Sequence, residues 1–147
     1  MKGLTLVELL IVIGIATILL GLTTINLVRV QQNTSLGAVS DILIADLKSQ
    51  QMKAMSGANG GGSFGIHFTS SNSYTLFKGS NYVPPGDFTV TLEDPISVST
   101  TYPGNEIVFS KTSGEVDGEH TITITNSAGG EQQTLTVNKL GVVKDVN

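Results

Sequence analysis

Residues Leu9 to Val28 read LLIVIGIATILLGLTTINLV, a run of twenty residues without a charged side chain. As an α-helix this run is about 30 Å long, which matches the hydrocarbon thickness of a bilayer. A cleaved secretory signal peptide has a shorter apolar region that ends at a small-residue cleavage site, and neither property fits here. The sequence therefore predicts a transmembrane helix rather than a signal peptide or the buried helix of a soluble protein.

Glu8 lies just before this run, inside an apolar stretch that starts at Leu4. An ionisable side chain at the edge of a spanning helix is costly and usually has a function. Two interpretations remain open. The carboxylate reaches the lipid headgroups from the helix end, or it pairs with a cation on another chain.

The residues from Gly3 to Leu10, GLTLVELL, followed by the long apolar helix, resemble the N-terminal signature of type IV pilins and type II secretion pseudopilins. The resemblance implies that prepilin peptidase cleaves between Gly3 and Leu4 and that the new N-terminus of Leu4 is methylated. Glu8 then becomes the fifth residue of the mature chain, the position of the family's glutamate. The resemblance also implies several partners: other pilin or pseudopilin subunits, the peptidase, an inner-membrane assembly platform and membrane lipid.

The chemistry of this N-terminus agrees with the resemblance. Cleavage after Gly3 creates an ammonium group on Leu4, and in a filament of staggered helices that group can pair with Glu8 of a neighbour. An unpaired carboxylate in an apolar bundle is strongly disfavoured, so the pair is expected to specify register more than to add stability. Lys2 and Arg29 flank the two ends of the helix, so their charges do not decide its orientation. The resemblance implies a single-pass protein of the cytoplasmic membrane, N-terminus inside, that later enters a periplasmic or extracellular filament.

An apolar stripe continues beyond the membrane run. Its members recur at helical steps and are Leu36, Val39, Leu43, Leu47 and Ala54. The polar residues between them are expected on the wet face: Asp41, Asp46, Lys48, Gln50, Gln51 and Lys53. Gly57 is a left-handed stop signal, so we expect helix from about Thr5 to Met55, with Gly37 as a weak point where the helix can kink. The stripe lacks sustained heptads, which favours packing against a head over an exposed coiled-coil stalk.

After Gly57 the pattern changes to alternation of apolar residues with Thr and Ser, which is typical of antiparallel sheet. The predicted strands are 64–68, 74–77, 88–92, 96–99, 106–109, 121–125, 134–137 and a short final strand at 140–143, with a polar turn at 126–133. We therefore predict an α+β fold, a long N-terminal helix packed on an antiparallel β head. The expected segments are a leader (1–3), a membrane or filament-core helix (4–30), an amphipathic helix (31–56) and the β head (57–147).

The C-terminal part also resembles minor pseudopilins of the GspH and FimT type. The similar segments are 49–54 at the helix end, 65–68, 74–77 and 140–143. The chain has no Cys, and its first Pro is Pro84, whereas many major pilins have a C-terminal disulfide and a Pro within the membrane helix. These differences favour a minor pilin or a pseudopilin subunit, or a further branch of the family.

Catalytic and ligand-binding signals are weak. The acidic segment from Glu115 to His120 lacks the layout of a calcium loop and is interpreted as a solvated turn, and His67 and His120 as surface histidines of strands. No nucleophile motif is present, so we expect no enzyme, no cofactor and no metal. The net charge of −4 and the lack of a basic patch disfavour binding of nucleic acid.

Two function classes remain. The first is a structural subunit of a type IV pilus or type II secretion pseudopilus, assembled through its N-terminal helix. The second is a membrane-tethered binding module that never polymerises. Processing at Gly3 discriminates between them, because a simple anchor needs neither Gly3 nor Glu8.

Overall fold

The computed structural model describes the backbone of residues 5–146 and the side chains of residues 5–20, 35–144 and 146. The chain divides into two compact units, Met1–Thr34 and Ser35–Asn147. The first is called the N-terminal unit below and the second the head. One helix, α1 (Leu6–Ser56), contributes residues to both units. The predicted processing residues Gly3 and Leu4 lie outside the described residues.

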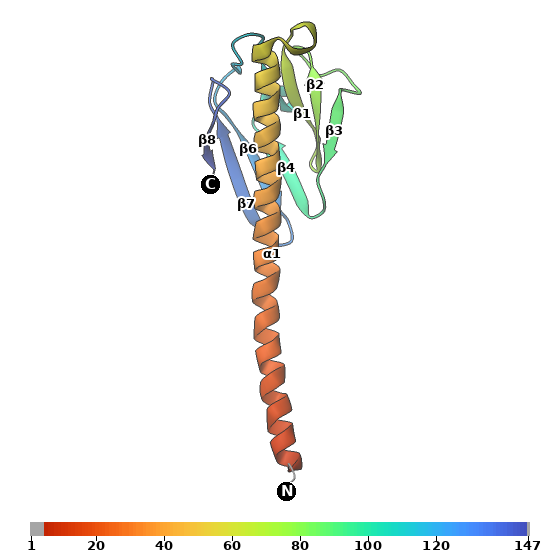
Figure 1. Ribbon diagram of the computed structural model, residues 1–147, viewed down its shortest axis with the longest axis vertical. Helices are drawn as coiled ribbons and strands as arrows, with labels where there is room; N and C mark the ends of the chain where they lie inside the picture. Colours follow the sequence, from red (N-terminus) through yellow and green to blue (C-terminus); the bar gives the residue numbers. More distant parts are fainter. Residues whose placement is uncertain (1–4, 147) are drawn as a thin grey trace. The chain divides into compact units, whose positions relative to one another are not determined.

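The N-terminal unit is helical throughout its described length after Thr5 (Figure 1). Every described side chain from Leu6 to Leu20 is exposed, and Leu6 retains 78% of its accessible surface. Over the described residues, no helix combines the length and hydropathy that a membrane crossing requires. The last eight residues of the predicted membrane run, 21–28, lie outside the described side chains.

The part of α1 in the head buries one stripe of side chains spaced four and three residues apart. The stripe consists of Leu36, Ser40, Leu43, Leu47, Gln50 and Ala54. The predicted apolar stripe is thus confirmed, with Val39 at its border. Gln50 was expected on the wet face and is instead 1% exposed, because its position continues this spacing. The helix ends as predicted at Gly57, which has a left-handed φ of 70°.

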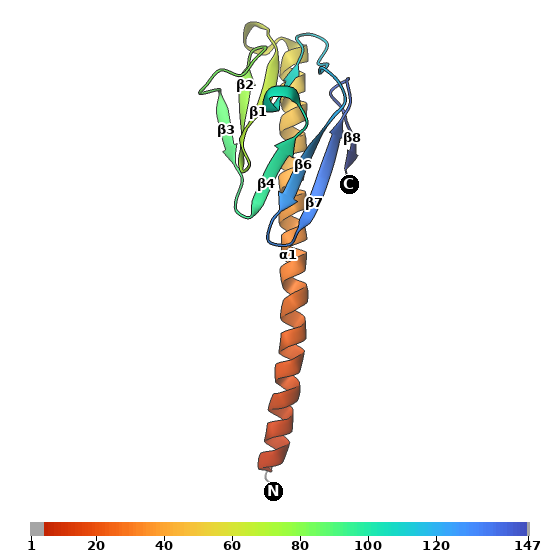
Figure 2. The ribbon, with the colours of Figure 1, turned by 180° about the vertical axis from the view of Figure 1, so that it is seen from behind.

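Two four-stranded antiparallel sheets form the rest of the head (Figures 1 and 2). The first sheet has the order β3 (Phe88–Thr91), β2 (Ser73–Lys78), β1 (Phe64–Ser70) and β5 (Glu106–Phe109). The second has the order β4 (Ile96–Thr100), β6 (His120–Asn126), β7 (Glu131–Val137) and β8 (Val143–Val146). Short 3₁₀ turns, η1 (Ala58–Gly60) and η2 (Pro103–Asn105), precede β1 and β5.

The alternation of apolar residues with Thr and Ser places one face of each sheet in a common core. Ile122 and Ile124 of β6 and Leu135 and Val137 of β7 have no exposed surface, whereas the Thr residues between them remain partly exposed. The helical stripe of the head packs into the same cluster of buried residues. Figures 1 and 2 show this part of α1 lying over the sheets on one side only. The predicted α+β fold, a helix packed on an antiparallel head, is therefore confirmed.

Two strands begin three residues away from their predicted starts. The final strand begins at Val143 rather than residue 140, because Gly141 has a φ of 74° and its N–H donates to the carbonyl of Asn138, which closes a turn. Likewise β7 begins at Glu131, inside the predicted polar turn. That turn is short because the N–H of Gly130 returns to the carbonyl of Asn126.

Candidate functional site

The first turn of α1 is closed by a reciprocal contact between Thr5 and Glu8. The backbone N–H of Glu8 donates to Thr5 Oγ1 at 3.3 Å, and the backbone N–H of Thr5 donates to Glu8 Oε2 at 3.4 Å. The Thr5 hydroxyl lies 3.4 Å from the same carboxylate oxygen. Thr5 precedes the helix and Glu8 is its third residue, which is the geometry of a capping box.

This contact gives Glu8 a structural role besides the two interpretations that its sequence position suggested. The pattern Thr-x-x-Glu was present in the sequence and is the known signature of such a helix start. The cap uses one carboxylate oxygen and leaves the group exposed, so Glu8 remains available to a cation. Because Gly3 and Leu4 lie outside the described residues, the predicted pairing of Glu8 with an ammonium remains a prediction.

The side chains around Glu8 are apolar and point outward on all sides of the helix. Leu6, Val7, Leu9, Leu10 and Ile11 each retain more than half of their accessible surface. A soluble monomer rarely exposes such a continuous apolar surface. The described side chains of the N-terminal unit thus form an exposed apolar surface with one carboxylate at its start.

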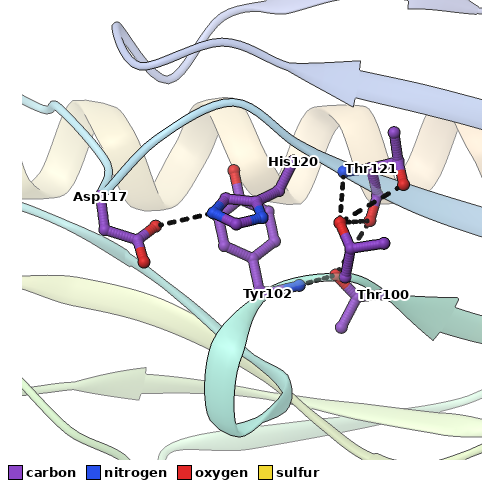
Figure 3. Close-up of polar contacts among 6 residues, drawn as sticks. Thr100, Tyr102, Asp117, His120 and Thr121 are labelled. Atoms are coloured by element: carbon purple, nitrogen blue, oxygen red, sulfur yellow. Dashed lines mark hydrogen bonds and ion pairs between the residues drawn. The ribbon is translucent and has the colours of Figure 1, made fainter.

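The acidic segment 115–120 is held against an aromatic ring (Figure 3). His120 Nε2 lies 3.6 Å from Asp117 Oδ1, and the His120 ring lies 4.4 Å from the ring of Tyr102. Beside them, Thr101 Oγ1 accepts a hydrogen bond from the backbone N–H of Thr121 at 2.9 Å. Asp117 is mostly exposed, in agreement with the predicted solvated turn, but His120 is partly covered.

Tyr102 is the buried member of this group. Its side chain is almost fully buried, and its hydroxyl has no hydrogen-bond partner among the described residues. Burial, followed by the nearby charge of Asp117, raises the pKa of the Tyr102 phenol. The phenol therefore stays protonated at physiological pH and does not serve as a base.

His67 is covered in a similar way on the outer face of the first sheet. Its ring stacks on Tyr82 at 4.1 Å between centroids, and its Nδ1 lies 3.8 Å from Glu106 Oε2. The same carboxylate oxygen accepts the backbone N–H of Tyr82 at 3.0 Å. His67 thus lies on the outer face predicted for it, although the ring of Tyr82 shields it from solvent. The prediction for His120 is wrong, because His120 shares the alternation of the buried Ile122 and Ile124 and lies at the edge of the core face, against the ring of Tyr102. The contacts of His67 position the segment between β2 and β3.

Neither the residues around His120 nor those around His67 have the composition of a metal site. Among the described residues, no three side chains of the His, Cys, Asp or Glu types come together to hold an ion. Each histidine has one carboxylate near it, which is fewer ligands than a structural or catalytic metal requires. The contacts of His67 and His120 instead hold loops against the sheets.

Comparison with solved structures identifies the fold. The type IV minor pilin FimU of Pseudomonas aeruginosa superposes with a TM-score of 0.58 at 12% identity, over 76% of this chain and 91% of that chain. The minor pseudopilin EpsH from the type II secretion system of Vibrio cholerae superposes with a TM-score of 0.56 at 15% identity, over 75% and 94%. Neither a protein-family model nor a curated protein sequence matches the chain.

At these identities the likeness concerns the fold. It was expected from GLTLVELL and from the alternating strands, two features of the sequence that are independent of each other. The chain has the fold of the minor pilins and minor pseudopilins.

Proposed function

We propose that this protein is a structural, non-catalytic subunit of a type IV pilus or type II secretion pseudopilus, and a minor subunit of that filament. The observation that carries the proposal is the exposed apolar start of α1 with Glu8 as its carboxylate, on a chain with the fold of two minor subunits. A membrane-tethered binding module needs the apolar helix as an anchor but has no need of Glu8, whereas a filament built from packed helices uses both.

The proposal includes the maturation steps that the sequence implies. Prepilin peptidase cleaves between Gly3 and Leu4, and Leu4 is then methylated. Before assembly the subunit spans the cytoplasmic membrane once with its N-terminus inside. An inner-membrane platform then extracts it from lipid into a periplasmic or extracellular filament, where its partners are other subunits.

In the filament, the Glu8 carboxylate pairs with the Leu4 ammonium of a neighbouring subunit. The capping box supports this role, because it orders the carboxylate at the first turn while leaving it exposed. An ordered group loses less conformational entropy when a partner arrives. Breaking such a pair inside an apolar bundle costs about 3–5 kcal/mol, because one charge stays buried without its partner.

Two variants separate the charge of Glu8 from its capping role. Glu8→Gln keeps a residue that can complete a capping box but removes the charge, whereas Thr5→Ala removes the cap and keeps the charge. Incorporation is measured as the protein in sheared filaments relative to the membrane pool. We expect Glu8→Gln to insert normally and to enter filaments poorly, and Thr5→Ala to enter them nearly as well as the natural chain.

The N-terminal mass of both variants is measured first, so that a defect in cleavage is not mistaken for a defect in assembly. Normal incorporation of Glu8→Gln would mean that the carboxylate only caps the helix. Absence of the natural protein from every filament fraction would refute the proposed function itself.

A further inference from the structure

The head contains an apolar groove between the first turns of its helix and the segment that joins β3 to β4. The groove measures about 340 Å³ and is lined by Ala38, Ile42, Val90, Leu92 and Pro95, among others. Ile42 retains 54% of its accessible surface although it faces this hollow. The groove is thus an apolar surface on which a side chain of another molecule can be buried.

The rim of this groove is acidic. Glu93 and Asp94 belong to its lining, and both are exposed. Neither takes part in an ion pair within the described part of the chain. A complementary occupant therefore presents an aliphatic side chain with a basic residue next to it.

The same chain carries such a surface in the turn between β7 and β8. Leu140 and Val142 are 60% and 51% exposed, and Lys139 and Lys144 flank them. Within the described residues Lys139 has no ion-pair partner, while Lys144 lies 3.8 Å from Glu119. We call the four residues Lys139, Leu140, Val142 and Lys144 the knob.

The knob is rigidly held. Gln51 Nε2 donates to the carbonyl oxygens of Leu140 at 2.7 Å and of Gly114 at 3.0 Å. Gly141 is buried with a φ of 74°, and a Cβ atom there would lie 2.6 Å from Gln51 Nε2. Because the backbone of the turn is fixed from inside, the side chains of Leu140 and Val142 are left on its outer surface.

Groove and knob lie at opposite ends of the head. The groove is built on Ile42, and the knob is fastened to Gln51, nine residues or about 14 Å further along the helix. The two surfaces differ, so two copies joined through them form a head-to-tail contact. Such a contact leaves one groove and one knob free rather than closing a dimer, so a pair of these minor subunits can still contact other subunits at both ends.

We propose that the groove of one copy receives Leu140 of a second copy of this chain, with Lys139 placed against Glu93 and Asp94. The proposal deepens the function proposed above and rests on it, since it names the contact between neighbouring heads. The apolar insertion supplies most of the affinity, while the charges select orientation, because exposed ion pairs contribute little energy.

Cysteine cross-linking tests the contact in the full chain. The natural sequence has no Cys, so only introduced thiols react. Two differently tagged copies, one with Ile42→Cys and one with Leu140→Cys, are produced in the same membranes and treated with a mild oxidant. Because these positions lie at opposite ends of one head, a disulfide between them joins two copies. The matched control pairs Leu140→Cys with Lys48→Cys, an exposed position of the same helix outside the groove.

We expect a dimer that carries both tags for the Ile42 and Leu140 pair and much less of it for the control pair. Absence of that dimer, while the protein is present in sheared filaments, would overturn the docking proposal and leave the filament role intact. Capture of a different protein by Ile42→Cys would also overturn it. Formation of the dimer without any incorporation into filaments would support docking and refute the filament role.

Charge reversal provides a second test. In copies that carry the cysteine pair, Lys139→Glu alone, or Glu93→Lys with Asp94→Lys, should lower cross-linking about threefold, as expected for exposed charges. Combining a copy that carries Glu93→Lys and Asp94→Lys with a copy that carries Lys139→Glu should restore cross-linking. Lys48→Glu is the control and should have no effect. Failure of the combination to restore cross-linking would refute the proposed placement of Lys139.

Discussion

The hydroxyl of Tyr74 donates a hydrogen bond to Asp46 Oδ2 over 2.7 Å and thereby ties β2 to α1. Tyr74 is 1% exposed, and Asp46 lies at the border of the helical face that contacts the sheets. Burial first, and then the hydrogen bond to Asp46 and its charge, raise the pKa of Tyr74. The phenol is thus fixed as a neutral donor between the two layers of the head.

Removal of this hydroxyl should weaken the head. Tyr74→Phe keeps the ring in the core but leaves the half-buried Asp46 without its donor. A buried hydrogen bond to a charged group is worth about 1.5–3 kcal/mol, so we expect a loss near the lower end of that range because water can reach Asp46 in part. Urea denaturation of the full chain in detergent, followed by far-ultraviolet circular dichroism, measures the change. An unchanged free energy of unfolding would show that the bond contributes nothing.

The opposite outcome is expected at Tyr102. Its hydroxyl is buried and has no partner among the described residues, so it has lost its contacts with water without replacement. Tyr102→Phe should therefore leave the free energy of unfolding unchanged or raise it by about 1 kcal/mol. The same denaturation experiment compares the two variants directly. A loss as large as that of Tyr74→Phe would reveal a hidden partner for Tyr102.

Alkaline pH should destabilise the head through both tyrosines. A phenol whose pKa is raised in the folded state binds its proton more tightly there than in the unfolded chain, where the pKa is about 10. The associated stability is complete below that pH and is lost as the pH rises toward the folded-state pKa. Unfolding midpoints measured between neutral pH and pH of about 11 should fall steeply above about 10. The decline should be flatter in a variant with both Tyr74→Phe and Tyr102→Phe; equal slopes would contradict the pKa directions.

Two glycines should respond in opposite directions to alanine. A Cβ atom on Gly65 of β1 would lie 2.5 Å from the carbonyl oxygen of Ile107 and 2.6 Å from the ring of Phe77, so Gly65→Ala must displace backbone or ring. We expect a loss of about 1–3 kcal/mol. A Cβ atom on Gly37, within the helix, would meet nothing within 4 Å, so Gly37→Ala should add about 0.5–1 kcal/mol. Thermal unfolding measures the shift of the unfolding midpoint in each variant. Shifts of the same sign would contradict the prediction.

The periodic patterns of the sequence predicted the fold well because they report burial directly. Alternation at Ile122 and Ile124 and the helical spacing of Leu43 and Leu47 both place apolar side chains in one core. The errors arise at polar residues whose spacing places them in the core although their chemistry suggests solvent. Gln50 was assigned to solvent by its chemistry, although its spacing from Leu43 and Leu47 already placed it inside.

The site was predictable only in part. Glu8 stood out as a lone acid beside an uncharged run, and Thr5 was readable as its capping partner. The groove at Ile42 and the ring contacts of His67 and His120 depend on which loops fold back over the sheets. Contacts between segments so distant in the chain leave no periodic trace in the sequence.

The mass of the N-terminus of the native protein tests the central proposal most directly. Full-length protein is isolated from membranes and sheared filaments of a host with active prepilin peptidase, and its N-terminal peptide is analysed by mass spectrometry. Gly3→Ala, which should be processed only in part, serves as the control for the cleavage site. The proposed function predicts a chain that begins at Leu4 and carries a methyl group on its amine. Recovery of only the intact chain beginning at Met1 would contradict it.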